Sequence, residues 1–386
     1  MVVVGGGPAG AVAARVAARA GARVLVVERS PRRPPRCTAL VGPRLLELLS
    51  VPPTVVLCGI QTVRVHAPGG RTVEFSAPQP RGYVLDRRGL DRWLLERAAE
   101  AGAEVWSPAT AVGLTGRRLH TTRGPVGFEV LIGADGAMSA VRRWEGLPPP
   151  AEILVGVQAT CSAPSLDCGT VELFLGQAIA PGGFAWVVPT GDGEARVGLL
   201  TSARREAKTL LSGFLASRFP DSEERGCESG LVPIGPAPRT VRAGTLLVGD
   251  AAGQVKPLSG GGLLFGALAA RIAGEVAAHN AHNPSSYETR WRKDIGDEIG
   301  FGLRARRAFL GLTDDQLDRV VACLDRPSIR RLVAAEGDID VPSRLARACV
   351  THPETWTAAL PLVRELGGWE AMKRVMGNLP ARAEPG

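Results

Sequence analysis

Several features that mark other classes of protein are scarce in this sequence of 386 residues. No stretch approaches eighteen consecutive uncharged apolar residues, which argues against a membrane-spanning helix. The first ten residues are typical of a strand and a turn, so we expect no signal peptide. Aromatic residues make up only 5% of the chain and no basic run is interleaved with them, which argues against nucleic-acid binding. We therefore expect a globular cytoplasmic protein with room for two or three domains.

Lysine is also scarce, although the formal net charge is +8. The excess comes almost wholly from arginine, which we interpret as an arginine-rich solvated surface; a peripheral contact with a membrane surface stays open. The many prolines and arginines hint at a thermophilic source. The only lysines are Lys208, Lys256, Lys293 and Lys373.

The cysteines lack the C-x-x-C spacing of zinc and iron–sulfur sites, so we expect no metal site and mostly reduced, buried thiols. Cys161 and Cys168 lie close enough in the sequence to pair, and the sequence leaves that pairing open. The seven cysteines are Cys37, Cys58, Cys161, Cys168, Cys227, Cys323 and Cys349.

Glycines dominate the first ten residues, MVVVGGGPAG. A short β-branched run is followed by glycines in G-x-G-x-x-G spacing, then by a helix-forming stretch and a second apolar run that ends at Glu28. In such a unit the three glycines allow a tight turn, the approach of a pyrophosphate and close helix packing, and the acid binds a ribose hydroxyl. This pattern predicts a dinucleotide site. Its expected cofactor-binding residues are Gly5, Gly7, Pro8, Ala9, Gly10, Glu28 and Arg29.

A second glycine-rich segment occurs late in the chain, in TLLVGDAAGQVKPLSGGG at residues 245–262. An apolar strand leads to Gly249 and Asp250, and three glycines open a long helix. A carboxylate at the strand end can accept a hydrogen bond from a cofactor hydroxyl, and N–H groups at the helix start can face an anionic edge. This segment returns to the nucleotide-binding pattern of the first turn, although roughly 240 positions separate the two.

Between these segments the patterns alternate between helix and strand. We expect helices over residues 43–50, 86–103 and 203–217, and a hairpin over residues 60–75 around Pro68. Residues 151–200 alternate like a sheet, and the last hundred residues are typical of helices. The connection up to about Pro35 is too rich in proline and arginine for regular structure.

Four stretches occur in the order seen in flavoproteins of the para-hydroxybenzoate hydroxylase fold. They are the opening VVVGGGPAGAVAARVAARAGARVLVVER, then VLDRRGLDRWL, GADGAMSAVRR and VGDAAGQVKPLSGGG. Within that superfamily the chain resembles the geranylgeranyl reductase family, especially its archaeal members, which saturate isoprenoid chains of membrane lipids. The closer likeness lies in RCTALVGPRLLELL, GQVKPLSGGG, FAWVVP and GLTDDQLDRVVACL.

The resemblance implies an α/β fold with a Rossmann-type FAD-binding domain, an inserted antiparallel-sheet substrate domain and a C-terminal helical region. The FAD-binding domain would be discontinuous, over residues 1–59, 85–150 and 235–285. The substrate domain would take residues 60–84 and 151–234, and the helical region residues 286–386.

The resemblance also implies roles for individual residues. Cys37 would lie near the flavin as a proton relay or gate, and Phe184, Trp186 and Pro189 would contact the lipid chain. Without the resemblance, Cys37 would be an ordinary loop residue and the three β-strand residues ordinary core residues. Asp135 would be a turn residue and Asp250 a helix cap. The further FAD-binding residues implied are Cys37, Thr38, Ala39, Arg87, Val112, Asp135, Gly249, Asp250, Pro257, Gly260, Gly261, Gly262 and Leu263.

One departure concerns the strand after Pro189, where the family pattern continues to G-x-G. This chain has Gly198-Leu199-Leu200, so the second glycine is missing, which weakens the assignment of the substrate.

The expected reaction is reduction of an isoprenoid C=C bond by hydride from flavin N5, with NAD(P)H or a ferredoxin-type protein as electron donor. Two alternatives stay open: an FAD-dependent aromatic hydroxylase of the same fold, and a non-catalytic FAD-stabilised lipid-binding module. A halogenase would need a lysine beside the substrate pocket, and none occurs before Lys208. A disulfide reductase would need a redox cysteine pair and a second nucleotide fingerprint, and the sequence has neither.

Overall fold

The computed structural model describes residues 1–30, 36–163, 166–220, 222, 224–280, 283–351, 364 and 373–376. The connection expected to be irregular up to Pro35 lies largely outside the described residues. The same is true of much of the helical region expected beyond residue 351.

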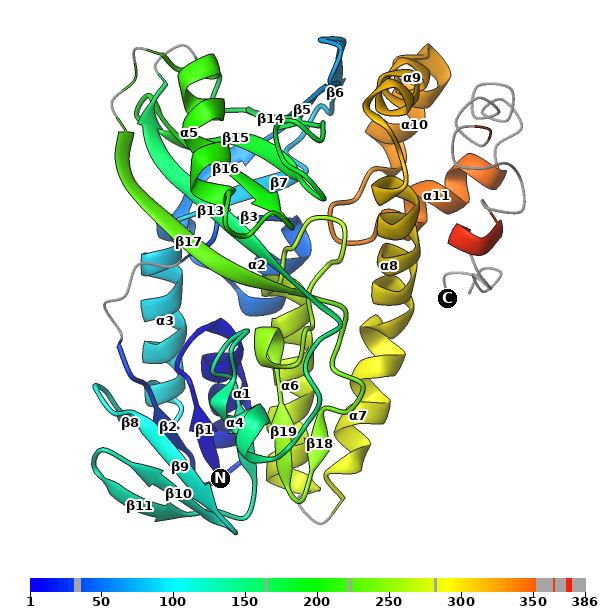
Figure 1. The fold of residues 1–386 in the computed structure, drawn as a ribbon. Coiled ribbons are helices and arrows are strands. Elements are labelled where there is room, and N and C mark those ends of the chain that lie inside the picture. The colour runs from blue at the N-terminus through cyan, green and yellow to red at the C-terminus, as the bar shows by residue number, and fades with distance from the viewer. Residues whose placement is uncertain are drawn as a thin grey trace.

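A six-stranded sheet forms the first layer (Figure 1). Its strand order is β18-β19-β12-β1-β2-β8, parallel except for the edge pair β18–β19. Buried apolar strands are typical of a parallel sheet covered by helices on both faces. The strands are β1 (Val2–Val4), β2 (Leu25–Val27), β8 (Glu104–Trp106), β12 (Leu131–Gly133), β18 (Val241–Arg242) and β19 (Thr245–Leu247).

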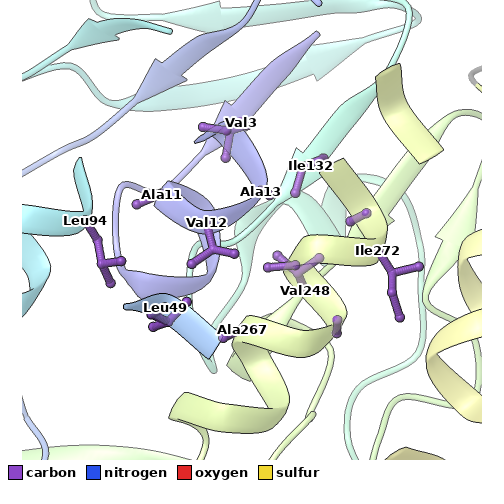
Figure 2. Close-up of a cluster of buried hydrophobic side chains, with 14 of the residues drawn as sticks. Val3, Ala11, Val12, Ala13, Leu49, Leu94, Ile132, Val248, Ala267 and Ile272 are labelled. Carbon is purple, nitrogen blue, oxygen red and sulfur yellow. The ribbon is translucent and has the colours of Figure 1, made fainter. Parts of the chain in front are cut away.

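Three helices pack around this sheet: α1 (Pro8–Arg19), α3 (Arg87–Glu100) and α6 (Leu263–His279). Small residues allow α1 and α6 to approach closely, because a Cβ at Gly274 would lie 2.6 Å from the carbonyl oxygen of Ala13. Figure 2 shows the resulting core, in which Val3, Ile132 and Ile272 come from three distant parts of the chain. The N-terminal helix therefore rests on a helix more than two hundred residues away.

A seven-stranded sheet forms the second layer, in the order β17-β13-β16-β15-β14-β5-β6. It is antiparallel except where β14 pairs in parallel with β5, so the sheet is mixed at one pair. Helix α5 (Ala207–Arg218) covers one face, starting four residues later than expected, and the long strand β17 was not anticipated. The strands are β5 (Thr62–His66), β6 (Thr72–Ser76), β13 (Glu152–Ser162), β14 (Thr170–Phe174), β15 (Phe184–Gly191), β16 (Glu194–Thr201) and β17 (Glu224–Ile234).

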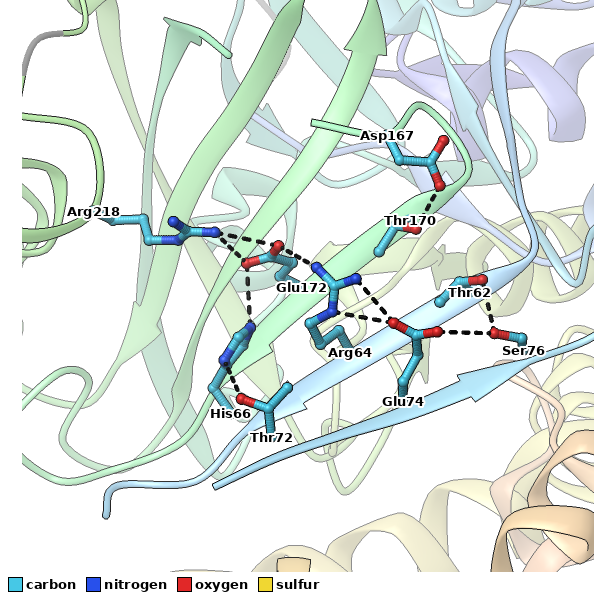
Figure 3. A network of polar contacts seen from close by, with 10 residues as sticks. All are labelled: Thr62, Arg64, His66, Thr72, Glu74, Ser76, Asp167, Thr170, Glu172 and Arg218. Atoms are coloured by element: carbon cyan, nitrogen blue, oxygen red, sulfur yellow. Dashed lines mark hydrogen bonds and ion pairs between the residues drawn. The ribbon is translucent and has the colours of Figure 1, made fainter. Parts of the chain in front are cut away.

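A polar network lies on the α5 side of this sheet (Figure 3). The side chain of Glu172 on β14 is only 1% exposed. Its carboxylate accepts hydrogen bonds from Arg64 Nη1 at 2.9 Å and from Arg218 Nη2 at 3.1 Å. His66 Nε2 lies 3.2 Å from the same carboxylate, and its ring stacks on Phe174 with the centroids 4.2 Å apart. The network thus connects α5 and the β5–β6 hairpin to β14.

Two small sheets and several short helices, among them the turn η2 (Gly249–Ala251), complete the body. One sheet has the order β3-β7-β4 and connects the two layers; the other has the order β11-β10-β9 and flanks the six-stranded sheet. Their strands are β3 (Leu40–Val41), β4 (Val56–Ile60), β7 (Gly82–Leu85), β9 (Ala111–Thr115), β10 (Arg118–Thr121) and β11 (Gly124–Gly127). The short helices are α2 (Pro43–Leu49), η1 (Pro53–Val55) and α4 (Ala140–Trp144).

The C-terminal elements run along one side of both layers (Figure 1). They are α7 (Ser285–Trp291), the π-helical turn η3 (Arg292–Gly296), α8 (Asp297–Leu310), α9 (Asp314–Leu324), α10 (Pro327–Glu336) and α11 (Pro342–Thr351). Arg306 of α8 is buried and bonds to Glu152 and the carbonyl oxygen of Gly182, which ties α8 to the seven-stranded sheet. Within the described residues, no helix is both long and apolar enough to span a bilayer.

A disulfide between Cys58 and Cys168 is an exception to the expectation of mostly reduced thiols. It joins β4 to the segment before β14, with the two Cα atoms 6.2 Å apart. Cys168 therefore does not pair with Cys161, which is buried under α5. The sequence offers no indication of this bond, because 110 positions separate its two cysteines and only the packing of the two sheets brings them together.

Candidate functional site

The first glycine turn connects β1 to α1 and is shaped by close backbone approaches. Gly5 adopts φ 103°, and a Cβ there would lie 2.4 Å from the carbonyl oxygen of Ala134. A Cβ at Gly10 would lie 1.9 Å from the carbonyl oxygen of Gly5, so these two positions require glycine for packing alone. Gly7 differs, because a Cβ there would meet no atom of the described part of the chain within 4 Å. The open space therefore lies over Gly7, at the uncapped N-terminus of α1.

The carboxylate of Glu28 lies beside this turn. Its Oε2 accepts the N–H of Gly6 at 2.6 Å and its Oε1 accepts the N–H of Ser30 at 2.6 Å. Each oxygen keeps a further lone pair for a ligand hydroxyl. Arg29 next to it is exposed, while Pro8 and Ala9 are partly buried at the start of α1.

The late segment comes to the first turn across the molecule. Gly249 adopts φ 61°, and a Cβ there would lie 3.0 Å from the side chain of Ala9. The backbone is also close-packed within the late segment, because a Cβ at Gly262 would lie 2.8 Å from Asp250 Oδ1. Burial raises the pKa of Asp250, and the Arg87 guanidinium opposes that rise. The two glycine segments are thus adjacent, as expected.

Helix α6 starts directly after Gly260, Gly261 and Gly262 without a side-chain cap, so its first N–H groups lack an intrahelical acceptor. Leu263 is its first residue, and Gly260 adopts φ 72°. Pro257, in the loop before it, is buried against Gly302 of α8. The loop is therefore held by the C-terminal region while its end stays available to a ligand.

Buried polar atoms without partners surround the same region. Among the described residues, Asp135 Oδ1 and Ser107 Oγ are buried and make no hydrogen bond, although Asp135 Oδ2 accepts the N–H groups of Ala140 and Val141. Orphaned buried groups destabilise a fold unless a ligand or water satisfies them. Together with the space over Gly7 and the two uncapped helix starts, these atoms fit a dinucleotide cofactor.

Cys37 lies in the loop before β3, which connects the glycine segments with the seven-stranded sheet. Ala39, at φ 60°, donates its N–H to Cys37 Sγ at 3.3 Å, and Thr38 Oγ1 bonds to Gln158 Oε1 on β13 at 3.1 Å. Burial would lower the pKa of Arg87, but the Cys37 sulfur and the carboxylate of Asp91 outweigh it and raise that pKa. The structure therefore brings Cys37, Arg87 and Asp250 into one electrostatic group.

The expected substrate-contacting residues separate onto two faces of β15. Phe184 and Trp186 share one face, with ring centroids 5.9 Å apart, and pack with Leu200. Pro189 pairs with Ala195, which belongs to the cluster under α5, so alternation places it on the other face. The Nε1 of Trp186 is buried and has no hydrogen-bond partner in the described part of the chain.

The missing second glycine of the G-x-G pattern changes the packing around Trp186, as Gly198 and Leu200 show. A Cβ at Gly198 would lie 2.6 Å from the ring of Trp186, so the glycine makes room for that ring. Leu200 is 2% exposed and adds an apolar side chain to the same cluster. Val112 on β9, another predicted cofactor residue, is 57% exposed.

The sequence reasoning missed two residues that organise this site. Gln254 is fully buried, accepts the N–H of Gly249 at 2.8 Å and donates to Tyr287 Oη at 2.8 Å. Arg196 on β16 donates Nη1 to the carbonyl oxygens of Thr38 and Leu85. A charged residue between the apolar Ala195 and Val197 was the only sign available for Arg196.

Comparison with known proteins gives consistent matches. A family model described as the geranylgeranyl reductase catalytic domain matches residues 152–230, and one for an NAD(P)-binding Rossmann-like domain matches residues 3–39. Digeranylgeranylglycerophospholipid reductase 2 of Methanothermobacter thermautotrophicus is 36% identical over 89% of this chain and 97% of its own. The digeranylgeranylglycerophospholipid reductase of Methanothrix thermoacetophila is 34% identical over 86% of this chain and 93% of its own.

Among solved structures, a geranylgeranyl bacteriochlorophyll reductase-like protein from Thermoplasma acidophilum superposes with a TM-score of 0.82. It is 24% identical, and the match covers 95% of this chain and 98% of that one. At this identity the match speaks for the fold, which is the mixed α/β architecture expected from the sequence.

Proposed function

Because this chain belongs to the geranylgeranyl reductase family, we propose that it uses FAD to saturate C=C bonds in geranylgeranyl chains of lipids or lipid precursors. The observation that carries the proposal is the meeting of the two glycine segments beside an apolar sheet face. Gly249 abuts Ala9 at the first turn, and the face that bears Phe184 and Trp186 belongs to the adjoining sheet.

FAD would be held mainly by backbone groups. Gly7 would face its pyrophosphate at the start of α1, Glu28 a ribose hydroxyl, and Asp135 and Asp250 the hydroxyls nearer the flavin. The N–H groups at the start of α6 would face the flavin edge on which negative charge gathers during reduction. When bound, FAD supplies the hydride; the protein supplies position and a dry pocket.

The substrate side would be apolar because a prenyl chain offers only hydrocarbon. Phe184, Trp186, Leu200 and Val188 would form the wall, and their burial excludes water from the reacting bond. Cys37 would donate the proton that accompanies the hydride, since it lies between the cofactor segments and this wall. Electrons would come from NAD(P)H or a ferredoxin-type protein, and the basic surface would contact anionic lipid at the membrane.

The test uses the FAD-loaded protein, reduced with dithionite without oxygen and then mixed with a geranylgeranyl phospholipid. We expect flavin reoxidation and a gain of two hydrogens per reduced double bond, read by mass spectrometry. A saturated lipid with the same headgroup should cause neither. The variant W186A should lower kcat/KM for the lipid, whereas W144A, which alters a tryptophan on α4 outside the apolar wall, should not.

Three outcomes would overturn the proposal. An unchanged lipid mass excludes the reductase. Oxygen-dependent NAD(P)H oxidation stimulated by an aromatic compound indicates a hydroxylase. Lipid binding without any flavin reoxidation indicates a non-catalytic module. For the membrane contact, liposome flotation that does not depend on anionic lipid would count against it.

A further inference from the structure

Lys256 is the only buried lysine among the described residues. Its side chain is 8% exposed, whereas Lys208, Lys293 and Lys373 are exposed. It is the first residue of the glycine loop, residues 256–262, which leads into α6. A buried ammonium destabilises a fold unless it is paired, so the partners of Lys256 indicate what the glycine loop is held against.

The backbone of Lys256 closes the glycine loop. Its N–H donates to the carbonyl oxygen of Gly261 at 3.0 Å, and its own carbonyl oxygen accepts the N–H of Gly260 at 2.8 Å. A Cβ at Gly261 would lie 2.8 Å from Cε of Lys256, so this glycine makes room for the lysine side chain. A shift of Lys256 therefore displaces the glycines that lead into the uncapped start of α6.

The ammonium of Lys256 bonds to the connection between α10 and α11. Its Nζ donates to Asp340 Oδ1 at 2.9 Å and to the carbonyl oxygen of Ile339 at 3.1 Å. Asp340 is 1% exposed, and its Oδ2 has no hydrogen-bond partner in the described part of the chain. That oxygen lies against Gly42, where a Cβ would collide with it. The two charges thus form an ion pair enclosed by protein.

The 338–343 segment, which carries Asp340, is also attached to α8. Ser343 donates its N–H to Glu298 Oε1 at 2.9 Å and its hydroxyl to Glu298 Oε2 at 2.5 Å. Beside these attachments the packing is incomplete, because a cavity of about 200 Å³ lies between the glycine loop, α8 and the segment. Its lining is mainly apolar and includes Phe265 and Pro342. Polar bonds, more than continuous apolar contact, therefore fix the segment against the loop.

We propose that Lys256 is a positioning residue whose bonds to Ile339 and Asp340 dock the 338–343 segment on the glycine loop and hold that loop where FAD binds. The inference rests on the proposed function, which supplies FAD as the cofactor. Hydrogen bonds are directional and apolar contact is not, and the cavity leaves the segment room to shift. Removing one charge leaves the other buried without its partner, which is strongly unfavourable. The C-terminal region thus completes the cofactor site.

The test compares the full-length protein with the variants K256M and K256M/D340L, and with K208M as a control at an exposed lysine. Hydrogen exchange of the FAD-free protein is read by mass spectrometry, and FAD affinity is measured by fluorescence titration. In K256M, peptides of the glycine loop should exchange about tenfold faster while those of β13 keep the parental rate. FAD should bind about tenfold more weakly, because apparent affinity falls with the fraction of molecules whose loop is in place. K208M should match the parent in both measurements.

The double variant separates positioning from stability. Met and Leu have nearly the shapes of Lys and Asp and bury no charge, so K256M/D340L should regain the parental midpoint in urea denaturation. Its FAD affinity should stay as weak as that of K256M, because neither side chain can make the directed bonds to the segment and the loop.

The proposal is wrong if K256M binds FAD with the parental affinity, or if K256M/D340L regains FAD affinity together with stability. It is also wrong if the β13 peptides of K256M accelerate as much as the loop peptides, because that pattern reports a general loss of stability. The exchange is measured without cofactor. A parent protein that takes up no FAD would therefore refute the proposed function, while the exchange rates still decide whether Lys256 holds the loop.

Discussion

Replacing Glu172 with glutamine should destabilise the protein in a pH-dependent way. The hydrogen bond from His66 is the largest cause that lowers the pKa of Glu172, burial opposes it, and Arg218 lowers it further, to about 2. A carboxylate whose pKa is depressed on folding stabilises the fold above its unfolded pKa. That stability is lost as the pH falls from about 4.5 toward 2.

The magnitude follows from the shift. A fall in the pKa from 4.5 to about 2 corresponds to about 3 kcal/mol at pH 7 and about 1 kcal/mol at pH 3. Arg64 and Arg218 are 35% and 44% exposed, so water screens their attraction and the real effect is smaller. We expect E172Q to lower the free energy of unfolding by about 2 kcal/mol at pH 7, and by less at pH 3.

Urea denaturation of the parent and E172Q at pH 7, 4 and 3 measures this difference. Glu194 provides a matched control, because it also pairs with an arginine but on the surface. The side chain of Glu194 is 40% exposed and that of Arg225 is 64% exposed. E194Q should change the free energy of unfolding by less than about 0.5 kcal/mol at every pH. A loss for E172Q that is no larger than that of E194Q, or that is the same at pH 7 and pH 3, would refute the reasoning.

Three further predictions concern other parts of the chain. Reducing the disulfide of Cys58 and Cys168 should lower the free energy of unfolding by up to about 4.8 kcal/mol, because it closes a long loop; denaturation with and without reductant measures this. In flavin titrations and thermal melts, G7A should weaken FAD binding while leaving the apoprotein's stability unchanged, whereas G10A should impair both. Y287F leaves two buried groups unpaired and should cost about 1–3 kcal/mol in urea denaturation, with weaker FAD binding.

Each of these has an outcome that contradicts it. Equal stability with and without reductant would mean that the disulfide does not constrain the unfolded chain. An apoprotein destabilised as much by G7A as by G10A would mean that no open space lies over Gly7. Normal stability and FAD affinity in Y287F would mean that Gln254 positions Gly249 without help from α7.

The local sequence determined much of this protein. The spacing of Gly5, Gly7 and Gly10, with the strand before and the helix after, specified the first turn, because Gly5 takes a positive φ and a Cβ at Gly10 would meet the carbonyl oxygen of Gly5 only a few residues away. Alternation located most strands of the second sheet, an amphipathic pattern located α3, and the three glycines marked the start of α6. The family resemblance supplied the pairing of the two glycine segments.

Tertiary structure alone decided which distant side chains meet. Cys58 and Cys168, Arg196 and Thr38, and Glu172 with Arg64 and Arg218 come together only through strand pairing and packing between segments that are distant in the sequence. A periodic pattern reports which face of a strand is buried, but carries no information about the residue opposite it. The first turn could therefore be predicted from the sequence, whereas these side-chain pairings could not.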